Sequence, residues 1–322
     1  MSERYARQSV LPQVGAAGQA RLAAARVLVV GAGGLGCAVL EYLCAAGVGQ
    51  IEVLDPDQVE LSNLHRQPLY RMSDLGAPKA SVAAASLTAL NPEVSIRGVI
   101  ERITPLNAPE WCERADVVVD AADSLALTYI LSDECHRRGT ALISASVLGL
   151  AGYAGVFCGG APSYRAVFPH MPQSAGSCAT NGVLGSAVGV LGTLQAHLTL
   201  AYLLQLAPSV LGRLVSVDLA TLRFGGFSFT AASEPAEPQL RFIAPEEVRP
   251  SDLVIDLRSL EETPVSPLAQ ARRLSVEALG EQPLPDADRV VLCCRSGIRA
   301  WQAGRRLLAR RSGEVVLVAF GA

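Results

Sequence analysis

The chain has 322 residues, of which 50% are hydrophobic and 18% charged, and its formal net charge is −3 at pH 7. This balance predicts a soluble α/β protein and argues against a basic surface for nucleic acid or anionic membranes. The eight cysteines are scattered, and the first fifteen residues are polar and charged, unlike a signal peptide. We therefore expect a cytoplasmic protein without a disulfide framework.

An amphipathic arm is predicted over residues 1–26, ahead of a strand at 27–30. A glycine-rich turn follows, then a helix to Ala46 and a second strand that ends at Asp55. Amides of such a turn can approach a phosphate, the helix N-terminus attracts negative charge, and the acid can bind a ribose. The segment therefore predicts a nucleotide site, for which NAD is one alternative.

The residues after the second strand indicate the type of nucleotide. Arg66 and Lys79 add two cations, and Asn63 and Gln67 add neutral hydrogen-bonding groups. A nicotinamide enzyme binds one pyrophosphate, for which the helix N-terminus already suffices. Two further cations suit a triphosphate whose charge rearranges during reaction, so ATP is favoured over NAD.

The middle of the chain alternates strands and helices. Helices are predicted at 79–90, 106–114 and from Ser124 to about Arg138, and strands at 94–99, 116–120 and 141–144. This alternation predicts a Rossmann-like, mainly parallel sheet with its site at the carboxyl ends of the strands. Asp123 follows one of those ends, and its carboxylate suits Mg²⁺.

Residues 182–206 carry no Asp, Glu, Lys or Arg and are long enough to span a bilayer. Two glutamines and a histidine interrupt the second half, and Gly185, Gly189 and Gly192 would let another backbone approach closely. A helix buried in a large core or a dimer interface is therefore expected, not a membrane span. Late strands are predicted at 215–218 and 223–229.

A proline-rich linker is predicted at 231–240, between a first domain, 1–230, and a small second α/β domain, 241–322. In the second domain Cys294 lies between a predicted strand and a basic helix that extends to Arg311. A thiol at a helix N-terminus and flanked by arginines should favour its thiolate, whereas Cys293 should face the core.

Seven segments of the first domain resemble, in order and spacing, the E1-like adenylyltransferases of the ThiF/MoeB/HesA family. They are Arg4-Tyr5-Ala6-Arg7-Gln8, GAGGLG at 31–36, Asp55-Pro56-Asp57, SNLHRQ at 62–67, Gly76-Ala77-Pro78-Lys79, Asn91-Pro92 and Asp120-Ala121-Ala122-Asp123. The resemblance implies ATP and Mg²⁺ as cofactors, a homodimer, and a ubiquitin-like sulfur-carrier protein ending in Gly-Gly as the partner. The carrier's terminal carboxylate would attack the α-phosphate of ATP.

The resemblance also implies roles for individual residues. Arg7 would reach a phosphate bound by the opposite protomer, Asp55 would bind the ribose and Asp123 would bind Mg²⁺. The residues expected to bind the nucleotide are Arg7, Gly31, Gly33, Gly34, Gly36, Asp55, Asp57, Ser62, Asn63, Arg66, Gln67, Lys79, Asp123 and Ser124. Those expected to take part in the reaction are Arg66, Lys79, Asp123, Cys178 and Cys294.

Cys294-Arg295-Ser296-Gly297-Ile298-Arg299 resembles the active-site loop of rhodanese-like sulfurtransferases, whose cysteine carries a persulfide. The resemblance implies that sulfur from a cysteine desulfurase or thiosulfate passes through Cys294 to the adenylated carrier. The product would be a thiocarboxylate for molybdopterin, thiamine or a related pathway. The domain is shorter than usual for rhodaneses, and their central histidine-glycine segment is not recognisable, so a degenerate docking domain is the alternative.

The sequence departs from the family in three places. Ser163 and Ala166 stand where relatives have the first of two cysteine pairs for zinc, and 224–240 contains no cysteine, so no zinc site is expected. Ser124, Thr128 and Ser132 replace the usual Asn, Arg and Asn. Cys178 lies where some members have a reactive cysteine on a crossover loop, and both reactive and buried states remain open. An NAD-dependent oxidoreductase and a non-catalytic carrier-binding module are the rival functions.

Overall fold

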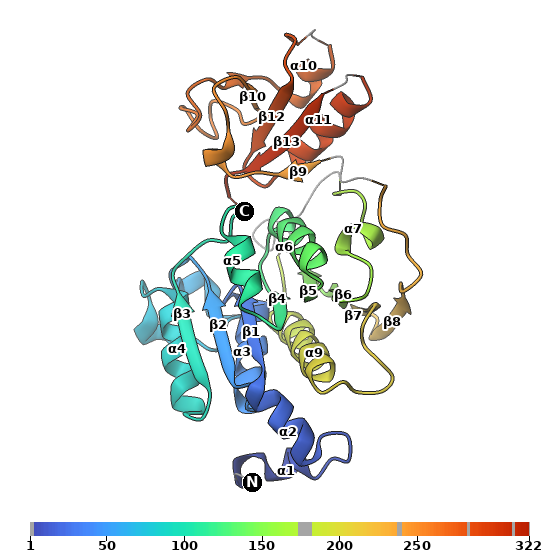
Figure 1. Cartoon of the computed structure of the whole chain (residues 1–322). Coiled ribbons are helices and arrows are strands. Elements are labelled where there is room, and N and C mark those ends of the chain that lie inside the picture. Colours follow the sequence, from blue (N-terminus) through green and yellow to red (C-terminus); the bar gives the residue numbers. More distant parts are fainter. Residues whose placement is uncertain (1–2, 173–181, 237–239, 282–283, 311–312, 322) are drawn as a thin grey trace.

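Two β-sheets organise the chain, one of eight strands and one of five. The computed structural model describes residues 3–172, 182–236, 240–281, 284–310 and 313–321. Helices α1 (Ala6–Ser9) and α2 (Gly15–Ala24) form the predicted arm at one end, and the smaller sheet lies at the other end (Figure 1). Short 3₁₀ helices are η1 (Glu3–Tyr5), η2 (Leu61–Asn63), η3 (Met72–Asp74) and η4 (Pro245–Glu247).

The larger sheet has the strand order β3-β2-β1-β4-β5-β6-β7-β8. Its parallel part contains β1 (Arg26–Val30), β2 (Gln50–Leu54), β3 (Ser95–Val99), β4 (Val117–Asp120) and β5 (Ala141–Leu148). Three antiparallel strands complete it: β6 (Ala151–Cys158), β7 (Arg213–Asp218) and β8 (Arg223–Ser228). The predicted mainly parallel α/β fold is confirmed, although β6 was not predicted and β5 is longer than expected.

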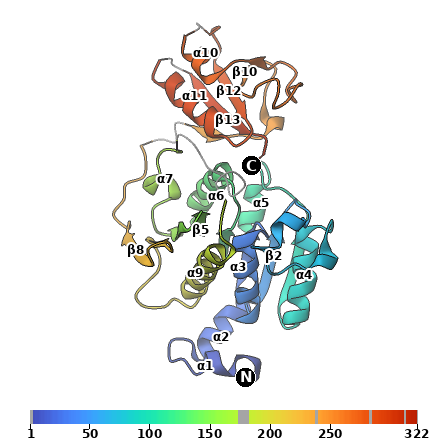
Figure 2. The same ribbon diagram turned by 180° about the vertical axis from the view of Figure 1, so that it is seen from behind.

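Helices cover both faces of the parallel strands, as Figures 1 and 2 show. Val27 and Val29 of β1 face a core shared with α3 (Gly34–Ala45), α4 (Lys79–Leu90) and α9 (Gly185–Leu203). Leu28 and Val30 face α5 (Ala108–Glu113) and α6 (Leu125–Arg138) on the other side. Because successive side chains of a strand alternate faces, a strand covered on both sides is a continuous apolar run.

The charge-free segment forms α9, which is long and apolar enough to cross a membrane, and half of its most apolar stretch is buried. A Cβ at Gly185 would lie 2.3 Å from the carbonyl oxygen of His65, and one at Gly192 would lie 2.7 Å from that of Leu35. A Cβ at Gly189 would meet nothing within 4 Å. Two of the three glycines therefore permit the close backbone packing that the sequence predicted, against the segment around the glycine turn.

The smaller sheet is entirely parallel, with the order β11-β10-β12-β13-β9. Its strands are β9 (Arg241–Phe242), β10 (Leu253–Asp256), β11 (Arg272–Arg273), β12 (Arg289–Cys294) and β13 (Glu314–Ala319). Helices α10 (Val276–Glu281) and α11 (Ile298–Leu308) accompany it, and α7 (Tyr164–Val167) belongs to the part of the chain before the linker.

Candidate functional site

The carboxyl ends of three neighbouring strands lie in one row. Val30 of β1 pairs with Leu54 of β2 and with Asp120 of β4. The glycine turn, Asp55 and the 121–124 loop therefore leave the sheet side by side. Open α/β sheets bind their ligands at this edge, where the helix N-termini also point.

The glycine turn has no room for side chains at two positions. Gly31 has φ of 99°, and a Cβ there would lie 2.8 Å from the backbone of Ala121. A Cβ at Gly36 would lie 2.0 Å from the carbonyl oxygen of Gly31. Gly33 is the N-cap of α3 and Gly34 its first residue, so the free amides of that helix end face the edge of the sheet. This is the geometry of a phosphate-binding turn.

Asp55 ties the second strand to the turn. One carboxylate oxygen accepts a hydrogen bond of 2.7 Å from the amide of Ala32, and the other accepts one of 2.8 Å from the amide of Asp57. Burial raises the pKa of Asp55, while these two backbone bonds act in the opposite direction. The carboxylate is thus held rigidly at the place where a ribose would be bound.

The SNLHRQ segment lies against the turn and contains an unusual buried polar group. Gln67 is only 3% exposed, and its amide nitrogen would lie 3.8 Å from a Cβ at Gly33. Its Oε1 is buried and has no hydrogen-bond partner among the described residues. A buried acceptor left unpaired costs about 1–3 kcal/mol, so this oxygen favours a polar ligand at the turn.

The other residues of this segment are held by local bonds. Arg66 donates a bond of 2.9 Å to the carbonyl oxygen of Ser62 and contacts His65. Asn63 is buried, and its side-chain oxygen accepts a bond of 3.2 Å from the amide of Glu60. Asn63 therefore shapes the segment, while Arg66 remains partly exposed beside it.

Lys79 is the first residue of α4 and is only 6% exposed. Its ammonium group lies 3.1 Å from the carboxylate of Asp57, whose side chain is largely exposed. Its backbone amide also donates to the Asp57 carbonyl oxygen. A buried cation with an exposed partner is available to a phosphate that competes with that carboxylate.

Asp123 is exposed just after β4, and Ser124 is the N-cap of α6, accepting a bond of 3.4 Å from the amide of Leu127. Asp120 anchors this loop from inside the protein. Its Oδ2 accepts bonds from the hydroxyls of Thr128 (2.6 Å) and Ser144 (2.9 Å). Complete burial raises the pKa of Asp120 to about 6.

Sequence reasoning gave Asp120 no role of its own. Its position could have indicated a structural role, because Asp120 is the last residue of an otherwise apolar strand. A carboxylate in a buried strand must accept hydrogen bonds from neighbouring donors. The same contacts explain two of the replacements on α6. Thr128 bonds Asp120, and Ser132 accepts a bond of 3.0 Å from the amide of Tyr164.

A carboxylate lies where relatives were expected to have zinc ligands. Glu234 accepts bonds of 2.6 Å from both the amide and the hydroxyl of Ser163, and His136 lies 3.8 Å from it. Ser163 in turn caps α7 through the amide of Ala166. Among the described residues there is no group of three or more His, Cys, Asp or Glu side chains that could hold a metal ion.

Two predicted residues lie away from this edge or outside the described chain. Arg7 is exposed on α1, whose neighbour Tyr5 bonds Asn91, and Gln8 bonds the Ala46 carbonyl oxygen. Asn91 comes just before β3 in the sequence, and Ala46 comes just before β2. Helix α1 therefore lies at the amino ends of the strands, opposite the glycine turn. Cys178 falls in 173–181, outside the described residues.

The predicted thiolate of Cys294 is not supported. Cys294 is fully buried at the end of β12, and burial raises the pKa of its thiol. The amides of Gly297 (3.1 Å) and Ala300 (3.4 Å) donate to the sulfur and, with Arg299, act against that shift without overcoming it. Burial, which the sequence pattern did not indicate, opposes the expected thiolate, and the role of Cys294 stays a prediction. Cys293 is buried on the opposite face, as predicted.

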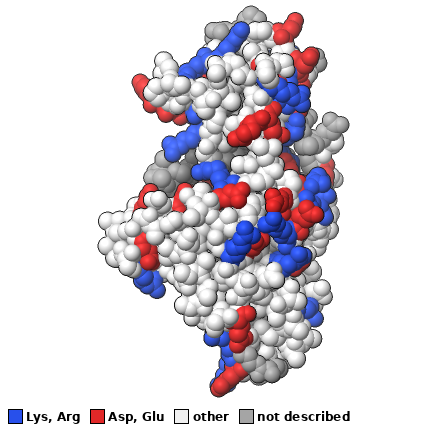
Figure 3. All heavy atoms as spheres, turned by 60° about the vertical axis from the view of Figure 1, so that its left-hand side comes forward, with Lys and Arg blue, Asp and Glu red and all other residues white. Residues whose placement is uncertain are grey.

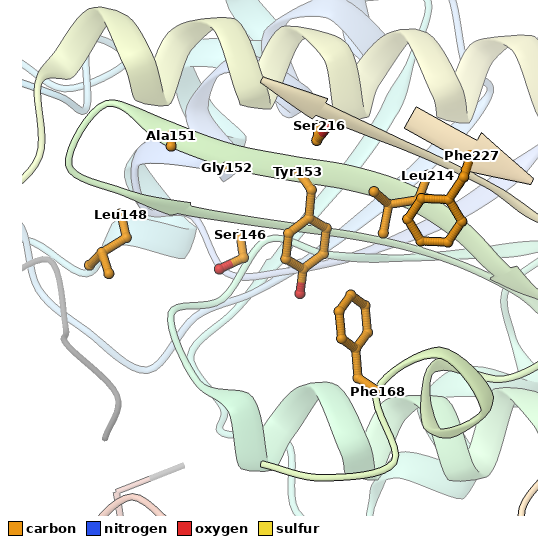
Figure 4. A pocket seen from close by; sticks show the side chains of 9 residues that line it. All are labelled: Ser146, Leu148, Ala151, Gly152, Tyr153, Phe168, Leu214, Ser216 and Phe227. Carbon is orange, nitrogen blue, oxygen red and sulfur yellow. The ribbon is translucent and has the colours of Figure 1, made fainter. Parts of the chain in front are cut away.

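An apolar hollow of about 480 Å³ opens on the antiparallel half of the larger sheet (Figure 4). Tyr153 and Phe168 stack beside it with ring centroids 5.3 Å apart. Its lining comprises Ser146, Leu148, Ala151, Gly152, Tyr153, Phe168, Leu214, Ser216 and Phe227.

The face of the molecule drawn in Figure 3 carries positive and negative side chains that lie among one another, and no continuous positive patch is visible on that face.

Comparison with curated proteins identifies relatives of the first domain. Adenylyltransferase and sulfurtransferase MOCS3 of Bos taurus is 47% identical over 218 residues, which cover 67% of this chain and 48% of that protein. The chain thus matches about half of MOCS3. The SAMP-activating enzyme E1 of Haloferax volcanii is 41% identical, over 69% of this chain and 83% of the enzyme. The sulfur carrier protein adenylyltransferase of Thermus thermophilus is 43% identical, over 69% of this chain and 85% of that protein.

Among solved structures, E. coli MccB crystallised with ATP has a TM-score of 0.62 and 23% identity, covering 71% of this chain and 72% of MccB. At that identity the likeness concerns the fold. The ThiF family model matches residues 5–239, which is most of the chain and ends where the smaller sheet begins. The match and the relatives above show that the chain belongs to the ThiF family.

Proposed function

We propose that this protein is an ATP-dependent adenylyltransferase that activates the C-terminal glycine of a ubiquitin-like sulfur-carrier protein ending in Gly-Gly. The observation that carries this proposal is the convergence of three features at one sheet edge. They are the amide-lined glycine turn, the unpaired oxygen of Gln67, and the buried cation of Lys79 with Asp57 as an exposed partner. The names of two relatives, a sulfur carrier protein adenylyltransferase and a SAMP-activating enzyme, support the same substrate class.

In the proposed reaction a carrier carboxylate oxygen bonds to the α-phosphorus of ATP while the bond to pyrophosphate breaks. The products are an acyl-adenylate and pyrophosphate. Such a step needs alignment and charge neutralisation more than a strong base. Gly33, Gly34 and Lys79 would hold the phosphates and Asp55 the ribose. Asp123, an exposed carboxylate at this edge, is the residue that fits Mg²⁺, which would neutralise phosphate charge when bound.

Arg7 supports a homodimeric form of this enzyme. It lies at the amino edge of its own sheet, so it is placed to serve a partner's site and not its own. We propose a cytoplasmic homodimer in which Arg7 contacts phosphate across the interface. The bonds from Glu234 to Ser163 support a protein that needs no zinc here, and metal analysis of the purified protein would test this.

The sulfur half of the proposal concerns a small rhodanese-like domain at 241–322, joined through a linker at 231–240. Cys294 ends a strand of a parallel sheet, and two amides of the next helix turn donate to its sulfur. Such a cradle suits a sulfur anion more than a neutral thiol. The donor would be thiosulfate or a cysteine desulfurase. The product would be a carrier thiocarboxylate for molybdopterin, thiamine or a related pathway.

ATP–pyrophosphate exchange tests the adenylation half. Exchange should depend on an added Gly-Gly-ended carrier, and it should survive Cys294→Ser but fall strongly in Lys79→Met. A Cys293→Ser variant is the matched control for the neighbouring thiol. Absence of exchange with every carrier offered would overturn the proposal, and binding of NAD in place of ATP would favour an oxidoreductase. Thiosulfate sulfurtransferase activity that is unchanged by Cys294→Ser would remove Cys294 from the reaction.

A further inference from the structure

The first turns of two helices from the two sheets touch. Gly297 is the N-cap of α11, and a Cβ there would lie 3.2 Å from the Cβ of Ala126 in the first turn of α6. Cys294 stands three residues before Gly297, and Asp123 stands three residues before Ala126. The loop that carries the thiol and the loop that carries the expected Mg²⁺ ligand therefore lead into adjoining helix ends.

One turn further along, the same two helices pack through aromatic rings. The ring centroids of Tyr129 in α6 and Trp301 in α11 are 4.9 Å apart. Both contacts lie at the N-terminal turns of the two helices, and from there α6 extends into the larger unit and α11 into the smaller one above it (Figure 1). The carboxyl ends of β4 and β12, which feed these helices, therefore face the same junction.

A buried cation fastens this junction. The guanidinium of Arg165 lies 4.9 Å from the ring centroid of Tyr129 and 5.3 Å from that of Trp301. It is also bonded to both carboxylate oxygens of Asp133, at 2.5 and 2.8 Å. Arg165 is only 6% exposed, and cation–π contacts are stronger where the cation is removed from water. One apolar core continues from β4 and α6 into β9, β12 and α11. The second domain therefore packs against the first through a continuous apolar core and the aromatic contacts of Arg165.

We propose that the Cys294 loop of each chain delivers sulfur to the adenylate formed on that same chain, across the α6–α11 contact. This inference rests on the proposed function and adds its route: the transfer occurs within one chain and not between the two protomers of a homodimer. Cys294 is fully buried, so its loop must open both to accept sulfur from an external donor and to deliver it to the adenylate.

The chemistry balances with thiosulfate, ATP and a thiol. The Cys294 thiolate bonds to the outer sulfur of thiosulfate, and sulfite leaves with the electron pair of the broken S–S bond, which gives the persulfide. The terminal sulfur of a Cys294 persulfide bonds to the carbonyl carbon of the acyl-adenylate, and AMP leaves with the electron pair of the broken C–O bond. The carrier is then joined to Cys294 by an acyl disulfide. A second thiol attacks the sulfur of Cys294, the S–S bond breaks, and the carrier thiocarboxylate departs. That thiol and Cys294 are left as a disulfide, which excess thiol reduces.

Complementation between two inactive chains tests the route. Asp123→Asn and Cys294→Ser chains, carrying different tags, are co-expressed and purified through both tags. Thiocarboxylate formation is measured with ATP, a Gly-Gly-ended carrier, thiosulfate and dithiothreitol. The mixed protein should make no more product than either variant alone. A matched control that pairs the wild-type chain with the double variant should give about half the wild-type rate, since one of two sites is complete.

Recovery of the mixed protein to the rate of that control would overturn transfer within one chain while leaving the proposed function intact. ATP–pyrophosphate exchange separates the two failures, because Cys294→Ser should retain it and Asp123→Asn should not. Thiocarboxylate formation that persists in pure Cys294→Ser protein would overturn both the sulfur half of the function and this inference.

Trp301→Ala gives a second, independent measurement. Loss of the ring should weaken docking, so coupled thiocarboxylate formation should fall while ATP–pyrophosphate exchange is kept. Thiosulfate sulfurtransferase activity should be retained, because the ring contact that is lost is the one with Tyr129 of the first domain. Arg306→Ala on the same helix, which contacts Val276 within its own domain, is the control and should leave all three activities unchanged. A variant whose coupled reaction is undiminished would contradict the docking role of Trp301.

Discussion

Asp120 offers a prediction whose sign and size follow from its surroundings. Complete burial raises its pKa from 3.8 to about 6 in the folded protein. The folded state therefore holds this proton more tightly than the unfolded state does. The resulting stabilisation is fully present below pH 3.8 and is lost as the pH rises through about 6. A shift of about two pKa units corresponds to about 3 kcal/mol.

Asp120→Asn removes the titration and keeps the shape of the side chain. Relative to this variant, the wild type should lose about 3 kcal/mol in its free energy of unfolding between about pH 4 and about pH 7. Urea unfolding at several pH values, followed by circular dichroism, measures the difference. Asp116, just before β4, is the control, because its bond to Arg26 lowers its pKa. Relative to Asp116→Asn, the wild type should lose stability only as the pH falls below about 3.8 and should show little change between about pH 4 and about pH 7. Parallel pH profiles for wild type and Asp120→Asn would refute the reasoning.

Four further substitutions have defined outcomes. Lys79→Met should lower the ATP–pyrophosphate exchange rate about 100-fold, the usual loss for one group that stabilises transition-state charge. Gly36→Ala should prevent folding, because its Cβ would lie 2.0 Å from a backbone oxygen, whereas Gly33→Ala, with its nearest neighbour 3.8 Å away, should fold and bind ATP more weakly by calorimetry. Glu234→Ala should lower the melting temperature through loss of about 1 kcal/mol from its bonds to Ser163, and unchanged melting would contradict that role.

The parallel half of the fold and most of the candidate site could be predicted from sequence because local signals coincide there. Each apolar run in this half is followed by a glycine or ends near an acidic residue. The pairing of β1 with β2 and β4 places those carboxyl ends side by side at one edge of the sheet. Strand β6 could not be predicted in the same way. Gly152 and Gly155 lower its β-propensity, and their role is tertiary, since a Cβ at Gly152 would lie 2.3 Å from a β5 carbonyl oxygen.

The state of Cys294 could not be predicted because it depends on a contact between distant parts of the chain. The helix N-terminus and the arginines are visible in sequence, and both favour a thiolate. The helix that follows the loop meets the first domain through Gly297 and Ala126, and through Trp301 and Tyr129. The pattern of residues within the second domain does not identify those partners. In the structure Cys294 is fully buried, and burial raises the pKa of its thiol.

Helix α6 connects the two halves of the proposed function. One face carries Thr128 and Ser132, whose hydroxyls hold Asp120 and the amide of Tyr164. Another face presents Ala126 and Tyr129 to the second domain. A long side chain at position 128 could not occupy the space in which the Thr128 hydroxyl makes its short bond to the buried carboxylate of Asp120. The replacements therefore fit a protein in which α6 is fixed from both sides, and weakening either face should disturb the position of the Asp123 loop.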